Sequence, residues 1–428
     1  MRKVMIAEGV RTPFTKAGSL QAEARTVDLG RYVVAELLVR AGIDPARVDE
    51  LVAGNVIQPV DAVNVARVIA LRAHVPNGVP AYTVHRNCAS GIQALAEGWM
   101  MISSGRADCV VCVGVESMSD APFLVKRPVR GWLTELQKKK SVAAKVGHLK
   151  KLPVKDIFPD VGLILGLTDP VSTLNMGQTA EKLAREFAIS RADQDRVAMT
   201  SNLRVAAAWE EGRLADEVMT TFPPPAYEPV ARDNGFRADS SLEKLASLKP
   251  VFDRANGTVT AGNSSQITDG ACAVLLTSEE FAAANGLKPL GAMVDFAFGG
   301  LDPSRMGLGP VYATHKIFSK HGMGWDKVDL VELNEAFAAQ AIACLRAWDS
   351  AEFYKREMGG GSPPGAPEWD RINVNGGAIA LGHPVGATGT RIVLTLMREL
   401  RRRGGTTGIA TLCIGGGQGA TVLVEAAK

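Results

Sequence analysis

The segment VDELVAGNV (48–56) has a similar pattern to VDLVELNEA (328–336) in the second half of the chain. Each is a short apolar run with an acidic start, which is typical of a buried strand. KVMIA (3–7) and residues 109–115 are also strand-like, and 27–41 and 88–104 have helical spacing, ended by Gly42 and Gly105. The pattern predicts an α/β fold with covered sheets.

The same alternation of strand-like and helical segments begins again after residue 286. Strand-like runs occur at 291–298, 327–333 and 408–414, and helical patterns at 310–321, 334–347 and 387–403. We therefore predict an internal duplication of one α/β unit.

Between the halves lies a stretch of different character, 120–250. It contains LQKKKSVAAKVGHLKKLPVKD (136–156), a helical pattern over 179–210 with Ser190 as an internal cap, and the prolines 223–225. The predicted layout is one half formed by 1–119 and 251–285, an inserted loop domain over 120–250, and a second half over 286–428.

The composition excludes several classes of protein. The 428 residues are 46% hydrophobic and 22% charged, with 48 basic against 45 acidic residues, so the net charge of +3 gives no reason to expect a nucleic-acid partner. Six cysteines are too few for a disulfide scaffold, and Cys109 and Cys112 lie in the apolar run CVVCVGV rather than in a zinc motif. We find no signal peptide or membrane span, and expect a cytoplasmic protein with no metal.

RNCASGIQAL (86–95) carries a candidate nucleophile. Small residues and a helical pattern follow Cys88, which places it at a helix N-terminus where the dipole favours the thiolate. The alternative is a buried structural cysteine.

NVNGGAIALGHPVGATGTRI (373–392) crowds glycines and prolines around His383, just before a helix. A histidine in such a loop suits a base that activates a thiol near neutral pH. The alternative is a glycine-rich turn with an incidental histidine.

LCIGGGQGA (412–420) places Cys413 at the end of a strand, before three glycines whose N–H groups can bind an oxyanion. LNEAFAAQ (333–340) places Asn334 at a strand-to-helix junction, where it either binds a water or substrate oxygen or caps the helix. GTVTAGNSSQITDGA (257–271) suits a narrow channel or a solvent loop.

Together these blocks resemble the thiolase family. VRTPF (10–14), RNCASG, GVESMS (114–119), NMGQTAE (175–181), GNSSQITDGA, NEAFA, NGGAIALGHPVGATG and CIGGGQGA occur in the family's order, nearly end to end. The resemblance implies the thiolase fold: two duplicated α/β halves with five-stranded mixed sheets in αβαβα layers, plus a loop domain that covers coenzyme A.

The family's chemistry is carried over by matching positions. The resemblance implies that Cys88 is the nucleophile, His383 its base and Cys413 a second acid and base. Asn334, through a water, and His383 would stabilise an enolate oxygen, and the N–H groups of Cys88 and Gly415 a tetrahedral intermediate. Ser265 would contact pantetheine, and Met176 and Phe337 would line its tunnel.

The implied reaction is thiolytic cleavage of 3-oxoacyl-CoA, or the reverse condensation, in fatty-acid β-oxidation. Coenzyme A is a substrate, and no cofactor is implied. The alternatives are a short-chain acetyl-CoA C-acetyltransferase that makes acetoacetyl-CoA, a decarboxylating 3-oxoacyl synthase, and an inactive acyl-CoA-binding protein. The synthase would need two histidines in the second half, where this chain offers Asn334, His383 and Cys413.

The lysine-rich region 120–170, with LRRRGG (400–405) and 242–260, resembles the β subunit of the trifunctional complex. That subfamily implies contact of the insertion with an α subunit or a membrane; the alternative is a solvated lid that attracts phosphates. Asn334 stands where that subfamily has histidine, and Asn175 where many short-chain enzymes have histidine, so the acyl length stays open. The family also implies a homodimer or homotetramer.

Overall fold

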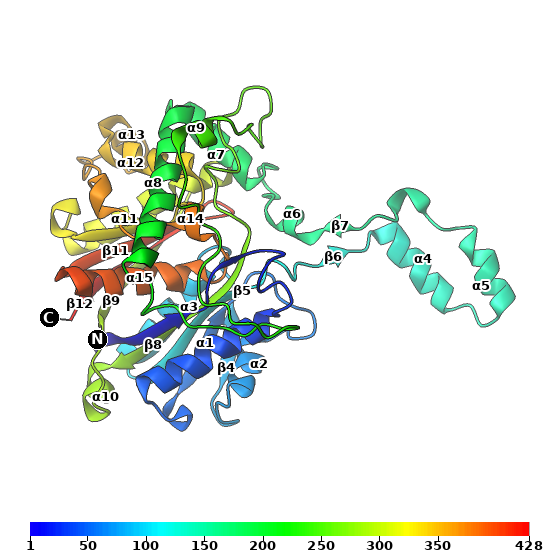
Figure 1. The fold of residues 1–428 in the computed structure, drawn as a ribbon, viewed down its shortest axis with the longest axis horizontal. Coiled ribbons are helices and arrows are strands. Elements are labelled where there is room, and N and C mark those ends of the chain that lie inside the picture. The colour runs from blue at the N-terminus through cyan, green and yellow to red at the C-terminus, as the bar shows by residue number, and fades with distance from the viewer. Residues whose placement is uncertain (428) are drawn as a thin grey trace.

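The computed structural model describes residues 1–427 (Figure 1). Its centre is a mixed sheet with the strand order β10-β11-β12-β9-β1-β8-β5-β3-β4, and β2 pairs with β8 beside this path. The strands are β1 (Val4–Arg11), β2 (Thr15–Lys16), β3 (Glu50–Gly54), β4 (Ala81–Val84), β5 (Cys109–Glu116), β8 (Thr268–Ser278), β9 (Gly291–Gly300), β10 (Leu330–Leu333), β11 (Thr407–Ile414) and β12 (Gln418–Ala426). The predicted α/β class is confirmed.

The two halves of the sheet share one topology. In the first half β3 is parallel to β4 and β5, and the steps to β8 and β1 are antiparallel. In the second half β10 is parallel to β11, and the steps to β12 and β9 are antiparallel. A parallel bridge between Val331 and Ile372 takes the place that β4 has in the first half. The duplication predicted from VDELVAGNV and VDLVELNEA is therefore visible in the strand order.

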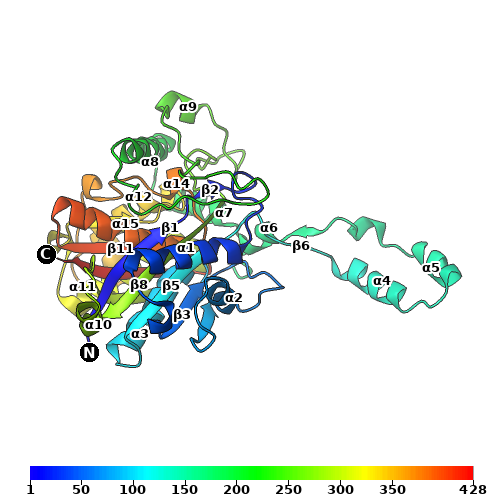
Figure 2. The same ribbon diagram turned by 60° about the horizontal axis from the view of Figure 1, so that its bottom comes forward.

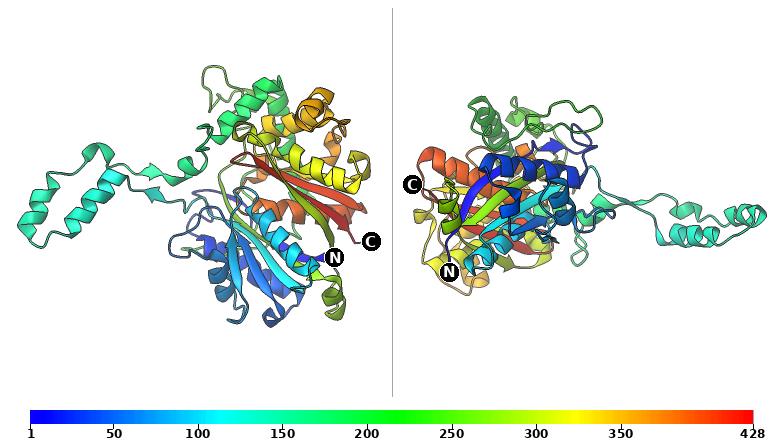
Figure 3. Two further views of the ribbon diagram at one scale, coloured as in Figure 1. Left: turned by 180° about the vertical axis from the view of Figure 1, so that it is seen from behind. Right: turned by 90° about the horizontal axis from the view of Figure 1, so that it is seen from below.

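Helices cover both outer faces and fill the space between the halves. Three large apolar clusters follow this layering: one joins α1 and α2 to the first half, one joins α11 and α12 to the second, and one joins both halves through α3 and α15. The order is helix, sheet, helix, sheet, helix, as Figure 3 shows from behind and below. The helices involved are α1 (Thr26–Ala41), α2 (Val65–Arg72), α3 (Ser90–Ser103), α11 (Gly309–His321), α12 (Ala338–Asp349) and α15 (Thr388–Arg403).

The two central helices touch through glycine. A Cβ on Gly91 of α3 would lie 2.8 Å from the backbone nitrogen of Thr390, and one on Gly389 of α15 would collide with the backbone nitrogen of Ile92. Backbone atoms cannot move aside as a flexible side chain can, so both positions require glycine. This contact brings the turn before α3 next to the loop before α15.

The insertion between β5 and β8 begins with an arm that projects away from the body (Figures 1 and 2). Its elements are β6 (Phe123–Leu124), α4 (Arg127–Gln137), α5 (Val142–Leu149), β7 (Asp160–Val161) and, at its base, α6 (Gly162–Gly166). Strands β6 and β7 pair with each other and form the neck of the arm.

The rest of the insertion packs on the body, where one sequence prediction is wrong. The helical pattern over 179–210 is two helices, α7 (Met176–Glu186) and α8 (Arg191–Glu210). Ala188 has the left-handed φ of 50°, and Ser190 accepts a hydrogen bond from the Asp193 backbone nitrogen to begin α8. The predicted helix over 334–347 likewise begins only at Ala338, because Phe337 is still extended.

The remaining helices are short. They are α9 (Leu242–Ala246), α10 (Glu279–Ala284), α13 (Ala351–Glu357), α14 (Ala378–Leu381), and the 3-10 turns η1 (Pro45–Arg47), η2 (Val154–Asp156), η3 (Pro303–Leu308), η4 (Trp325–Lys327) and η5 (Trp369–Arg371). Among residues 1–427, no helix is both long and apolar enough to cross a bilayer.

We expect Gly389→Ala to lower the free energy of unfolding by about 1–3 kcal/mol, because the added methyl overpacks a backbone contact. Thermal melting followed by circular dichroism measures this. Gly78→Ala is the matched control, since a Cβ there has no atom within 4 Å. Equal melting temperatures for the two variants would contradict the role given to the helix contact.

Candidate active site

Cys88 lies in the turn between β4 and α3, half-buried. The turn is closed by Ser90, whose hydroxyl accepts from the Arg86 backbone nitrogen at 2.9 Å and donates to the Asn87 carbonyl at 2.7 Å. Asn87 has the left-handed φ of 44°. The nucleophile candidate thus lies two residues before α3, close to the predicted position.

The expectation that this helix end favours the thiolate is wrong for the resting protein. Burial raises the pKa of the Cys88 thiol, and hydrogen bonds from the Gly415 backbone and from its own backbone lower that pKa by less. Desolvation of a thiolate is costly, so burial has the largest effect on the pKa of Cys88.

His383 follows α14 in the glycine-rich loop, and its backbone nitrogen donates to Gln266 at 3.1 Å. Gly382 before it has φ 97°, and a Cβ there would collide with the Thr268 side chain. The loop is therefore tight, as its sequence predicted.

The Thr388 hydroxyl lies 2.6 Å from His383 Nδ1 and 3.1 Å from the Pro384 carbonyl, so its one proton can go to either acceptor. His383 Nε2 is buried with no partner. Burial and the positive charge of Arg391 lower the pKa of His383 to about 3, which keeps the imidazole neutral.

Cys413 is buried near the end of β11. Burial, and then the neighbouring Cys88, raise the pKa of its thiol. Gly416 and Gly417 follow with φ values of 87° and 77°, so the backbone turns sharply just beyond Gly415. Cys413 is thus a protonated thiol that can donate a proton in a reaction.

A cavity of about 500 Å³ joins these groups, which we call the Ser265 cavity. Ser265 is fixed there by a hydrogen bond from its backbone nitrogen to the Ala336 carbonyl at 2.9 Å. Seven of the eight residues predicted from the sequence line it: Cys88, Met176, Ser265, Phe337, His383, Cys413 and Gly415.

Asn334 is the exception. It directly follows β10, is fully buried, and does not line the Ser265 cavity. It does not cap α12, so the capping alternative is wrong. Both polar atoms of its side chain are without partners.

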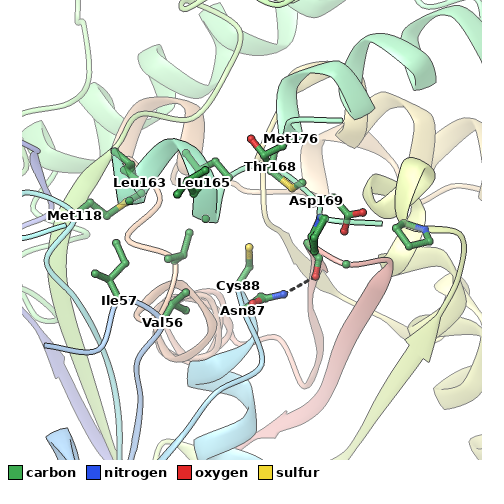
Figure 4. Close-up of a pocket in the computed structure, with 18 of the residues that line it drawn as sticks. Val56, Ile57, Asn87, Cys88, Met118, Leu163, Leu165, Thr168, Asp169 and Met176 are labelled. Atoms are coloured by element: carbon green, nitrogen blue, oxygen red, sulfur yellow. Dashed lines mark hydrogen bonds between the residues drawn. The ribbon is translucent and has the colours of Figure 1, made fainter. Parts of the chain in front are cut away.

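Two further cavities adjoin the site. The basic cavity, of about 480 Å³, contains Lys16, Arg237 and Lys244 and shares Lys16, Ala261 and Gln266 with the Ser265 cavity. The α6 cavity, also of about 480 Å³, meets the Ser265 cavity at Cys88, Met118, Leu167, Met176, Val385 and Gly415 (Figure 4).

The sequence analysis did not identify the residues that hold the site in place through hydrogen bonds. Glu116, within the GVESMS block, accepts hydrogen bonds from the backbones of Val56, Ile57 and Gly386 and from the Asn55 amide. It ties the wall of the α6 cavity to the His383 loop. Neither Glu116 nor Thr388 has a signal of its own beyond lying in these motifs. No group of three or more His, Cys, Asp or Glu suited to a metal occurs within residues 1–427.

Known proteins match this chain along nearly its whole length. Residues 4–280 match the family model "Thiolase, N-terminal domain", and 287–426 match "Thiolase, C-terminal domain". The chain is 40% identical over 424 residues to a 3-ketoacyl-CoA thiolase of Yersinia pestis (strain Pestoides F), covering 99% of this chain and 97% of that one.

Solved structures are equally similar. Human mitochondrial 3-ketoacyl-CoA thiolase in complex with CoA is 37% identical with a TM-score of 0.87, covering 100% of this chain and 98% of that one. The Bacillus anthracis acetyl-CoA acetyltransferase is 36% identical with a TM-score of 0.87, covering 100% and 99%.

We expect iodoacetamide to alkylate Cys88 about tenfold faster per pH unit from about pH 5.5 to about pH 8.5, since a thiol of raised pKa gains thiolate tenfold per unit below that pKa. If the histidine beside Cys88 titrated near pH 6.5, its positive charge below that pH would stabilise the thiolate. The alkylation rate would then stay constant over a range of pH instead of falling tenfold per unit. The low pKa of His383 removes that plateau. Mass spectrometry of the Cys88 peptide measures the rate, and a plateau between pH 5.5 and 7 would contradict the assigned neutral pair.

Proposed function

Because the chain belongs to the thiolase family, we propose that it is an acyltransferase that cleaves 3-oxoacyl-CoA with coenzyme A, giving acetyl-CoA and a shortened acyl-CoA. The observation that carries this proposal is the meeting of Cys88, His383 and Cys413 on one cavity. Relatives named 3-ketoacyl-CoA thiolase support the same reaction.

The first half-reaction needs a thiolate and a proton donor. His383 Nε2 takes the Cys88 proton as the sulfur attacks the 3-oxo carbonyl. The N–H groups of Cys88 and Gly415 are proposed to bind the resulting oxyanion, since both residues line the cavity into which the Cys88 sulfur opens. The carbon–carbon bond then breaks, the acyl group stays on Cys88, and Cys413 protonates the acetyl-CoA enolate.

The enolate oxygen needs its own donors. We propose His383 together with a water held by Asn334, whose buried amide has unused hydrogen-bonding capacity. In the second half-reaction the coenzyme A thiol loses its proton to the same groups and attacks the acyl-cysteine thioester. Condensation is the reverse of these steps, and none requires a metal or redox cofactor.

Coenzyme A is proposed to lie in the Ser265 cavity and the basic cavity. The narrow, mostly apolar channel past Ser265, Met176 and Phe337 suits pantetheine. Lys16, Arg237 and Lys244 at its continuation suit the phosphates of the nucleotide.

The alternatives have less support. Identity to a full-length 3-ketoacyl-CoA thiolase favours that activity over a short-chain acetyl-CoA C-acetyltransferase, and an inactive binding protein would not retain the whole cysteine–histidine–cysteine set. A place in fatty-acid β-oxidation follows from the proposed substrate.

The assembly and compartment stay predictions: a homodimer or homotetramer, in the cytoplasm. The domain limits at 119, 250 and 285 stay predictions as well. The arm projects away from the body of the protein, which does not fit a solvated lid that covers the body. It exposes Val142, Val146, Leu149 and Phe158 beside its lysines, as a surface for an α subunit or a membrane would.

The test is coenzyme-A-dependent loss of 3-oxoacyl-CoA, followed through its enolate absorbance. We expect Cys88→Ala to lower kcat at least about a thousandfold, because the covalent intermediate is lost, and Cys413→Ser and His383→Gln to lower it at least about a hundredfold. Cys109→Ala is the control, since that buried cysteine lies in β5 away from the cavity. Full activity of Cys88→Ala would overturn the proposal.

A further inference from the structure

Glu335 is a buried carboxyl group to which the proposed reaction assigns no task. It directly follows Asn334 and is 2% exposed, and neither of these two residues lines the Ser265 cavity. Ala336 and Phe337, the next two residues, do line it. The junction between β10 and α12 therefore has two residues on the cavity and two behind its wall.

Both oxygens of the Glu335 carboxyl group accept hydrogen bonds. Oε1 accepts from Asn373 Nδ2 at 2.7 Å. Oε2 accepts from the Ser201 hydroxyl of α8 at 2.6 Å and from the Ile379 backbone nitrogen of α14 at 3.4 Å. Burial raises the pKa of Glu335, and these hydrogen bonds counter the rise. One side chain thus joins the junction after β10 to α8, to α14 and to the segment before α14.

Asn373 binds the residue on the other side of Asn334. Its Oδ1 accepts from the Leu333 backbone nitrogen at 2.9 Å, and its Nδ2 donates to the Leu333 carbonyl at 2.8 Å. The second proton of the same Nδ2 is the one that Glu335 accepts. Asn373 therefore holds the chain on both sides of Asn334, through the backbone of Leu333 and through the carboxyl group of Glu335.

The side chain of Asn334 depends on this support. Both polar atoms of its amide are buried without partners, and its backbone nitrogen donates to the Thr411 carbonyl at 2.9 Å. The direction of the amide therefore follows from the backbone of residues 333–335. This direction matters because Asn334 is the residue proposed to hold the water at the enolate oxygen.

The carboxyl group of Glu335 also borders the segment that leads to His383. The Ser201 hydroxyl, which donates to Glu335, accepts from the Gly377 backbone nitrogen at 3.0 Å. A Cβ on Gly377 would collide with the Glu335 carboxyl group. Gly377 directly precedes α14, and only Gly382 separates α14 from His383. Glu335 thus lies against both segments that carry the proposed enolate donors.

His383 has contacts of its own that do not involve Glu335. Its Nδ1 lies 2.6 Å from the Thr388 hydroxyl, and its backbone nitrogen donates to the Gln266 carbonyl at 3.1 Å. Glu116 holds the same loop by accepting from the Gly386 backbone nitrogen at 3.0 Å. A change at Glu335 is therefore expected to move Asn334 more than His383.

Building on the proposed function, we propose that Glu335 is a positioning residue for the enolate step, which keeps Asn334 and its water in place beside His383. Glu335 touches no substrate and acts through Asn334. The breaking of the carbon–carbon bond produces the enolate and depends on this support. The transfer of the acyl group from Cys88 to coenzyme A forms no enolate and does not depend on it.

The two half-reactions can be measured separately, because the proposed mechanism is ping-pong. The kcat/KM for 3-oxooctanoyl-CoA includes each step up to the release of acetyl-CoA, and therefore the bond cleavage. The kcat/KM for coenzyme A includes only the transfer of the acyl group from the enzyme. Both values come from one set of initial rates in which each substrate is varied.

Glu335→Gln keeps the size of the side chain but replaces one accepting oxygen by an NH₂ group that can only donate. The donors on that side then lose their acceptor, and the junction shifts. We expect kcat/KM for 3-oxooctanoyl-CoA to fall at least about tenfold and kcat/KM for coenzyme A to change less than about threefold. Ser201→Ala removes the hydroxyl between Glu335 and Gly377, so it should change the two values in the same unequal way and keeps the test possible if Glu335→Gln does not fold.

Glu181→Gln is the matched control. Glu181 is also 2% exposed, and its Oε1 accepts from the backbone nitrogens of Thr258 at 2.9 Å and Val259 at 2.8 Å. This variant should lower the melting temperature and change both kcat/KM values by the same factor. Equal falls of the two values in Glu335→Gln and Ser201→Ala, or wild-type values in both, would overturn the assignment while leaving thiolysis intact. A wild-type protein that cleaves no 3-oxoacyl-CoA would overturn the proposed function, and this inference with it.

Discussion

The backbone contact between α3 and α15 is the constraint on which the site depends. Cys88 precedes one helix and His383 the other, and they come from halves of the chain almost three hundred residues apart. Gly91 and Gly389 let the helix ends approach until main-chain atoms touch, and Gly114 adds a third close approach, with a Cβ there 2.6 Å from the Gly386 carbonyl. Catalysis by residues on two loops requires a constant distance between Cys88 and His383. A contact between backbones keeps that distance constant, because backbone atoms have no alternative rotamers.

The same packing sets the electrostatics. A centre formed by two helices between two sheets excludes water, so charged forms are disfavoured: the pKa of Cys88 and of Cys413 rises, and that of His383 falls to about 3. Both members of the pair are then neutral at rest, and the proton moves only as the sulfur attacks. The negative charge of the oxyanion develops only during the attack, when oriented N–H groups can stabilise it. Stabilising this transition-state charge lowers the barrier, whereas stabilising an ion pair in the resting enzyme would not. Thr388 supports this by holding His383 Nδ1 in a 2.6 Å contact, which leaves Nε2 free to face the reaction.

The layers and most of the site could be predicted from the sequence, because both depend on patterns within short segments of the chain. Alternation of apolar runs and the echo between 48–56 and 328–336 are enough for the duplicated sheet, and Cys88, His383 and Cys413 each lie in a motif of small residues. Local patterns could not show that the helical periodicity over 179–210 is interrupted at Ala188, nor that burial raises the pKa of Cys88. The places of Asn334 and Asn87 also have no local signal: Asn334 is buried and does not line the Ser265 cavity, and Asn87 reaches Gly415, more than three hundred positions later.

The two halves and the insertion have separable tasks. The halves hold the groups that form and break bonds, and their positions are tied by glycine contacts that tolerate little change. The insertion supplies α6, which borders the α6 cavity, and Leu167 and Met176, which border both the α6 and the Ser265 cavities. Substitutions on α6 therefore leave Cys88, His383 and Cys413 in place, whereas substitutions near Gly389 move the elements that carry Cys88 and His383. A fold divided in this way separates the residues that make and break bonds from most of those that shape the space around them.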